Sequence, residues 1–145
     1  MLIFPATLRR FSHTVKINPR LLRPYARQGI RCPMLIYKIF RADEWQSLQD
    51  NGVTEGAPID ITDGFVHFST AGQVRETAAR HFAGEENLFL LALEADALGA
   101  ELKWEASRGG QDFPHLYRSL TLQDILWSRA LPLVDGTHQF PEDLA

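Results

Sequence analysis

Regular alternation of apolar and polar residues begins only after position 34 of this chain. Residues Leu35–Arg41 (LIYKIFR) predict a first strand. The uninterrupted apolar run at 88–93 (LFLLAL) is typical of a central strand that is buried on both faces. Other extended segments are predicted at 65–69 (FVHFS), 101–105 (ELKWE), 113–117 (FPHLY) and 125–134.

Helical signals are fewer. Asp43 and Gln46 have the spacing of a capping box, which predicts a helix that begins at this point. Trp45 and Leu48 would share the apolar face of that helix, and the Asn-Gly pair at 51–52 would end it.

Gly, Pro, Asp and Thr dominate residues 54–63, so this segment is predicted to be a loop. One helical turn is expected at 121–124, and Pro132 places the last strand at a sheet edge. Because strands outnumber helices in the second half, the pattern predicts an α+β fold, and 145 residues suit one domain.

The stretch DGFVHFST at 63–70 carries the strongest functional signal. A tight turn at Asp63-Gly64 leads into the short strand, and Thr70 and Gln73 then repeat the capping-box spacing. This spacing predicts a second helix over about 71–83, which Gly84 ends. Strand and helix would therefore meet at residue 70.

Alternation along this strand separates its side chains into two sets. Val66 and Phe68 are expected to face the core, and His67 and Ser69 the opposite side. The unpaired N–H groups of a helix N-terminus suit a phosphate. We therefore interpret His67 as a candidate general base, and Ser69 and Thr70 as candidate ligand-binding residues. The alternative is a half-buried structural histidine bonded to backbone.

Later segments add four candidates. His115 and Tyr117 share one strand side and would either line a cleft or pack at its rim. Glu105 follows an indole that can raise the pKa of a carboxyl group, so it is a candidate acid or base; otherwise it is a solvated strand-end charge. Arg108, in a Gly-rich loop, could clamp a phosphate or remain solvated. We predict that His67 and His115 converge on one cleft.

Charge is distributed unevenly along the chain. Residues 1–33 contain 7 of the 15 basic residues and none of the 18 acidic ones. The remaining 8 basic and 18 acidic residues give positions 34–145 a net charge of −10. Such an acidic body repels a phosphate backbone and is not expected to bind nucleic acid non-specifically.

The basic segment 1–33 differs from the rest in composition, and Met34 stands just before the first strand. This segment has three possible interpretations: translation truly starts at Met34, the segment is a disordered basic arm, or it is a targeting peptide. The first two are preferred. The single cysteine, Cys32, suits a reducing cytoplasm, where we expect the protein to reside. No apolar run is long enough to span a membrane.

Several classes of site lack their sequence signals. The chain contains neither G-x-x-x-x-G-K-[ST] nor G-x-G-x-x-G, so P-loop and Rossmann nucleotide binding are unsupported. Its histidines show no H-x-x-x-H spacing and no C-x-x-C occurs, so no metal site is expected.

DGFVHFST, the Gln-Val…Thr-Ala…His-Phe helix, WEASRGG and FPHLY together resemble the family called domain of unknown function 952, over about residues 34–133. The resemblance implies a compact fold of the ADP-ribosyltransferase type, with a split, mainly antiparallel sheet and two main helices. GFVHFST also resembles the NAD-binding motif of diphtheria-toxin-like ADP-ribosyltransferases, and VHFS a segment of NAD-dependent RNA 2′-phosphotransferases.

This resemblance implies NAD or a related phosphorylated nucleotide as ligand. Where those transferases carry Arg or His on the first strand, this chain has Tyr37 and Lys38, which makes Tyr37 a candidate ligand-binding residue. Their late-strand Glu has no counterpart at 125–134, and the nearest candidates are Glu101 and Glu105, earlier in the chain. Two hypotheses follow: an enzyme that acts on such a nucleotide, and a non-catalytic module that binds a small ligand or a protein through the same cleft.

Overall fold

A computed structural model describes residues 32–144 of the chain. The predicted basic extension, 1–33, lies outside the described residues except for its last two positions. The first strand, β1 (Leu35–Arg41), begins directly after Met34, whose carbonyl accepts a hydrogen bond from the amide of Ala95 at 2.9 Å.

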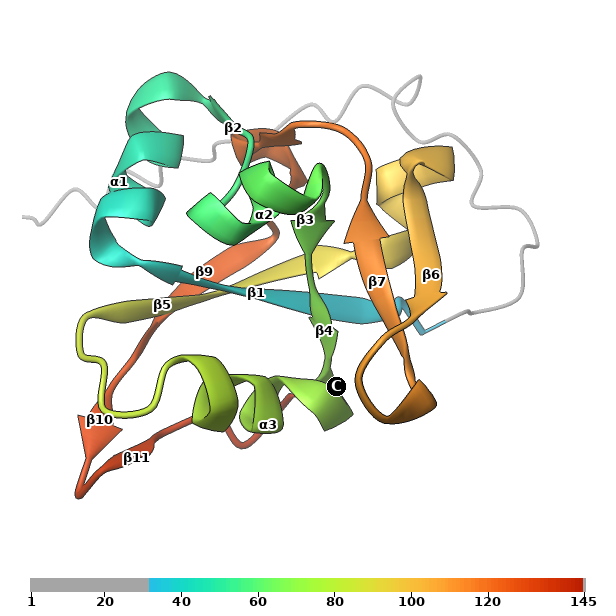
Figure 1. The fold of residues 1–145 in the computed structure, drawn as a ribbon. Coiled ribbons are helices and arrows are strands. Elements are labelled where there is room, and N and C mark those ends of the chain that lie inside the picture. Colours follow the sequence, from blue (N-terminus) through green and yellow to red (C-terminus); the bar gives the residue numbers. More distant parts are fainter. Residues whose placement is uncertain (1–31, 145) are drawn as a thin grey trace, which may run out of the picture. The chain divides into compact units, whose positions relative to one another are not determined.

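A four-stranded antiparallel sheet in the order β4–β1–β5–β9 forms the centre of this unit (Figure 1). The apolar run at 88–93 becomes β5 (Leu88–Glu94), which pairs with β1 along its whole length and with β9 (Trp127–Leu131) on its other side. The predictions of a buried central strand and of a late edge strand are therefore confirmed. Short β4 (Ser69–Thr70) forms the opposite edge.

A second antiparallel sheet, in the order β3–β7–β6, adjoins the first. The chain crosses between the two sheets at Phe68, whose amide donates to the carbonyl of Pro114 at 3.0 Å. The predicted strand at 65–69 is thus two short strands in two sheets. The second sheet consists of β3 (Val66–His67), β6 (Leu102–Ala106) and β7 (Asp112–Leu116).

Two further antiparallel pairs complete the strands of the described residues. They are β2 (Val53–Thr54) with β8 (Leu120–Thr121), and β10 (Leu133–Val134) with β11 (Thr137–His138). Short 3₁₀ helices form at η1 (Ala95–Glu101), η2 (Arg108–Gly110) and η3 (Leu122–Asp124). The last of these lies where one helical turn was predicted. The α+β class is confirmed.

Both predicted helices form, and a third joins them. Helix α1 (Ala42–Asn51) ends at Gly52 as expected but starts two residues earlier than predicted, because the capping box is Arg41 with Glu44 and not Asp43 with Gln46; Glu44 accepts the N-cap amide of Arg41 at 2.8 Å. Helix α3 (Ala71–His81) is capped as predicted, with the Thr70 amide donating to Gln73 at 3.0 Å.

Helix α2 (Pro58–Asp63) occupies most of the segment predicted to be a loop, and this prediction was wrong. Proline is favoured in the first turn of a helix because its missing N–H has no partner to lose there. Asp63 ends the helix and Gly64 follows it in the left-handed conformation, so the Asp-Gly pair is a helix stop and not a hairpin turn.

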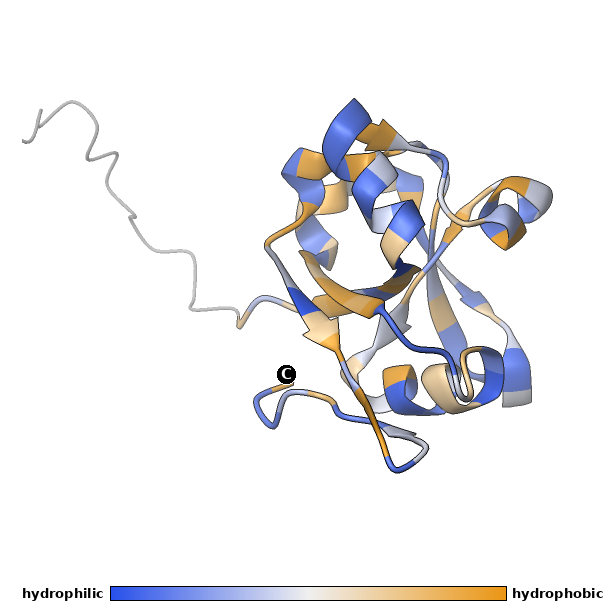
Figure 2. Cartoon of the chain, turned by 90° about the vertical axis from the view of Figure 1, so that its left-hand side faces the viewer, coloured by the Kyte–Doolittle hydropathy of each residue, from blue (hydrophilic) through white to orange (hydrophobic). Residues whose placement is uncertain are grey.

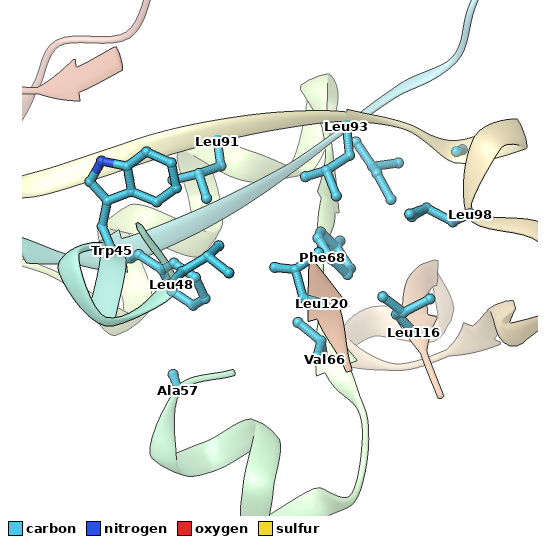
Figure 3. Packing of buried hydrophobic residues seen from close by; sticks show 13 residues of the cluster. Trp45, Leu48, Ala57, Val66, Phe68, Leu91, Leu93, Leu98, Leu116 and Leu120 are labelled. Carbon is cyan, nitrogen blue, oxygen red and sulfur yellow. The ribbon is translucent and has the colours of Figure 1, made fainter. Parts of the chain in front are cut away.

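Apolar side chains are buried on both sides of the central sheet. One cluster lies under α1 and α2 and includes Trp45, Leu48, Val66 and Phe68, which confirms the predicted core faces of α1 and of the DGFVHFST strand (Figure 3). The other packs α3 against the opposite side. Along the helices, hydrophobic and hydrophilic positions alternate as stripes, as expected for helices with one buried face (Figure 2). No described helix is long and apolar enough to cross a membrane.

Candidate functional site

The polar side chains predicted to form a site meet on one face of the β3–β7–β6 sheet. His67 and His115 are direct partners in the antiparallel pairing of β3 with β7. Lys103 and Glu105 on β6 pair with His115 and Phe113 on β7, so they lie on the same face. The other face is apolar, since Val66 and Leu116 belong to the core. We call the polar face, defined by these residues with Phe65 and Tyr117, the histidine face.

The imidazole of His67 is held by a buried aspartate from α2. Its Nδ1 lies 2.6 Å from Oδ1 of Asp60, and its backbone amide donates to the same oxygen at 3.0 Å. Asp60 is 1% exposed and also accepts the amide of Ala57 at 2.7 Å. On the outer side, Nε2 of His67 lies 3.0 Å from Oδ2 of Asp63. Two carboxylates of one short helix therefore flank one ring.

Lys38 on β1 is a further partner of Asp60. Its Nζ lies 2.6 Å from Oδ2 of Asp60, and both side chains are buried. Burial lowers the pKa of Lys38, and the attraction of Asp60 offsets only part of that effect. Burial alone would raise the pKa of Asp60, but the hydrogen bond from His67 and the ammonium of Lys38 together hold it below the ordinary value. The buried carboxylate is therefore charged and fully bonded.

His115 has a carboxylate partner of its own. Its Nδ1 lies 2.8 Å from Oε2 of Glu105, which also accepts the hydroxyl of Tyr117 at 2.7 Å. Hydrogen bonds from His115 and Tyr117 lower the pKa of Glu105, and the same carboxylate raises the pKa of the Tyr117 hydroxyl. The pKa of Glu105 is therefore lowered, whereas the alternative of an acid or base beside an indole required a raised pKa. The Nζ of Lys103 sits 4.6 Å from the centre of the Tyr117 ring.

The two imidazoles are neighbours. Their ring centroids are 5.4 Å apart, so these residues, 48 positions apart in sequence, do come together, while the cleft predicted at them stays a prediction. They do so as partners on adjacent strands, not across a split sheet. Phe65 stacks on His115 at 4.2 Å and lies 5.2 Å from Tyr117. Each imidazole is thus anchored through Nδ1, and both pack against the ring of Phe65.

Four other predicted residues lie away from the imidazoles. Ser69 is 3% exposed, and its hydroxyl bonds that of Thr77 on α3 at 2.9 Å, because the chain has changed sheets after Phe68. Thr70 caps the same helix. Tyr37 is buried in the core beside Trp127, on the side of β1 that faces α3. Arg108 lies at the far end of β7 and packs its guanidinium against Phe113 at 5.5 Å.

Sequence reasoning missed Asp60, Lys38 and the role of Phe65. A signal for Asp60 was present, because Pro58 followed by an acid marks a helix start. Gly56 supplies a second signal. Its φ of +102° suits glycine, and a Cβ there would lie 2.3 Å from Oδ2 of Asp60, so the backbone passes directly against this carboxylate.

Comparisons agree with the motif-based resemblance. Residues 39–128 match the family described as "Protein of unknown function (DUF952)", and the chain belongs to this family. No curated protein matches the chain. The solved structures similar to it include the protein CC0527 from Caulobacter crescentus.

The crystal structure of CC0527 is 50% identical over 72% of this chain and 93% of its own, with a TM-score of 0.70. A double mutant of CC0527 gives 49% identity and the same TM-score. The solution structure of CC0527 gives 48% identity and a TM-score of 0.65, over 72% of this chain and 90% of that one. Fold and family are thereby shared with CC0527.

Proposed function

We propose that the histidine face binds a small phosphorylated ligand of the nucleotide class, such as NAD or ADP-ribose, and that His67 and His115 act on it as an acid–base pair. One observation carries the proposal: two imidazoles from neighbouring strands lie 5.4 Å apart, and a carboxylate anchors each through Nδ1. A purely structural strand face has little reason to collect two such pairs. The ADP-ribosyltransferase-like character of the fold is part of this proposal.

Anchoring through Nδ1 leaves Nε2 of each ring as the atom that meets a ligand. Among the described residues, none bonds Nε2 of His115, and only Asp63, half-exposed at the end of α2, reaches Nε2 of His67. One nitrogen can accept a proton from an attacking hydroxyl or water while the other donates one to the leaving group. Two imidazoles so close together suit a phosphate or ribose oxygen between them.

Aromatic rings beside the imidazoles suit the planar part of such a ligand. Tyr117 is 40% exposed and borders Phe65. Lys103, on the same face, adds a cation for a phosphate group. The charged side chains that surround the two imidazoles are Asp60, Asp63, Glu105, Lys38 and Lys103. The groups on this face that can meet the ligand's negative charge are therefore Lys103 and the imidazole nitrogens.

A non-catalytic binding module is the second candidate, and the carboxylates favour it. Strand β9 contains no Glu, and Glu105 already accepts bonds from both His115 and Tyr117. A carboxylate engaged in this way orients its partners rather than attacking a substrate.

Calorimetric titration with ADP-ribose and NAD, together with an assay for nicotinamide release, tests both candidates. We expect His115→Gln to weaken ADP-ribose binding by about tenfold or more, the loss of a charge-assisted hydrogen bond. His138→Gln is the matched control, because His138 bonds the carbonyl of Glu85 on another part of the domain. Binding without nicotinamide release would favour the module, and no binding of either compound would refute the proposal.

A further inference from the structure

A pocket of about 150 Å³ lies between α3 and the loop that joins β6 to β7. Helix α3 contributes Thr77, Arg80 and one acidic residue, Glu76, and the loop contributes Arg108 and Gln111. Phe113, the second residue of β7, forms part of the lining. Gln73 ties the two walls together, since its side-chain amide donates to the carbonyl of Asp112 at 2.9 Å. The pocket is therefore built by two connected elements.

Positive charge dominates this pocket. Arg108 is half-buried, and no described carboxylate forms an ion pair with it; its guanidinium rests 5.5 Å from the Phe113 ring. Arg80 pairs with Glu76 at 2.8 Å, but both side chains are more than half exposed, so water screens this pair. Arg80 and Arg108 both line the pocket. Burial first, and then these two guanidiniums, lower the pKa of His81.

The pocket adjoins the histidine face. Phe113 and His115 lie two residues apart on the same side of β7, a separation of about 7 Å along a strand. Phe113 also pairs across the sheet with Glu105, the carboxylate that anchors His115. Phe113 therefore links the histidine face to Arg108, whose guanidinium packs against its ring.

We propose that this pocket is an anion subsite that takes a second phosphate of the same ligand, so that the domain selects compounds with a diphosphate over those with one phosphate. This inference rests on the proposed function for the ligand as a whole. The subsite itself depends on Arg108, which presents a planar fork suited to two phosphate oxygens, and on Arg80 across the pocket.

Titration of the full chain with inorganic pyrophosphate, followed by amide NMR, tests the subsite directly. Pyrophosphate should shift the amides of 108–113 and of the middle of α3, and Arg108→Gln should weaken its binding by about tenfold or more. Glu76→Gln should tighten binding, since it removes the carboxylate that competes for Arg80. Arg129→Gln is the control, because Arg129 is an exposed arginine that pairs with Asp143 elsewhere.

Equal losses in Arg108→Gln and Arg129→Gln would overturn the inference, since they would mean general charge attraction. So would a pyrophosphate response absent from 108–113. A second titration separates the two proposals. If His115→Gln weakens ADP-ribose and Arg108→Gln does not, the subsite fails while the histidine face stands; if pyrophosphate binds through Arg108 but ADP-ribose leaves both imidazoles unaffected, the proposed function fails alone.

Discussion

At the scale of single residues, Asp60 connects the core to the proposed site. One of its oxygens receives Lys38 and the Ala57 amide, and the other receives the ring and the amide of His67. Removing one partner of a buried ion pair is costly because the other charge stays buried without compensation. The stability of the domain and the orientation of His67 therefore depend on one carboxylate.

Asp60→Asn should lower the free energy of unfolding by about 3–5 kcal/mol, since it leaves the Lys38 ammonium buried and unpaired. The double variant Lys38→Met with Asp60→Asn should recover most of this loss, because the buried charge is gone. Denaturant unfolding of both variants measures the difference. Asp60→Asn within about 1 kcal/mol of the parent would mean that the pair contributes little.

At the scale of elements, the sequence predicted those helices and strands whose apolar residues recur at regular spacing. Strands β1 and β5 and the buried face of α1 follow from such patterns, which burial enforces over several residues. Helix α2 does not, because it has only six residues and its one buried side chain is the polar Asp60. Its two isoleucines, Ile59 and Ile61, are exposed, so no amphipathic period marks it.

Ser69 shows a second limit of the same kind. Alternation along one continuous strand placed it beside His67, but the chain leaves one sheet and enters another at Phe68. Strand alternation holds within a sheet and does not carry across such a crossing. By contrast, the pairing of β3 with β7 did bring His67 and His115 together. In the sequence, their only link was that each has a polar residue two positions later, Ser69 or Tyr117.

The crossing yields a test of core packing. Phe68 is 3% exposed in the larger apolar cluster, so Phe68→Ala should destabilise the domain by about 3–5 kcal/mol. Ser69→Ala should cost only about 1 kcal/mol, the value of one hydrogen bond to Thr77. Denaturant melts compare the two, and the reverse order would show that the strand faces are wrongly assigned.

At the scale of the whole molecule, two partly or fully buried carboxylates of the acidic body, Asp60 and Asp124, are paired with specific donors. Burial alone would raise the pKa of Asp124, but bonds from Arg118 and Thr121 keep it below the ordinary value, as Lys38 and His67 do for Asp60. A carboxyl whose pKa is lower in the folded state than in the unfolded state stabilises the fold above its ordinary pKa. That contribution disappears as the pH falls through the folded-state value.

We therefore expect the free energy of unfolding to fall as the pH drops below about 4, where unfolded carboxyl groups take up protons first. The double variant Lys38→Met with Asp60→Asn should lose less stability over this range, since it lacks one of the responsible groups. Urea unfolding across the acidic range gives the two slopes. Identical slopes would show that Asp60 has the same pKa in both states.

NMR titration of the histidine imidazoles with ADP-ribose tests the central claim most directly, because it observes the two proposed groups themselves. We predict that the ring signals of His67 and His115 shift together and saturate with one dissociation constant, while those of His138 do not move. Ring signals of His67 and His115 that stay unchanged at saturating ADP-ribose, or that respond no more than those of His138, would contradict the account.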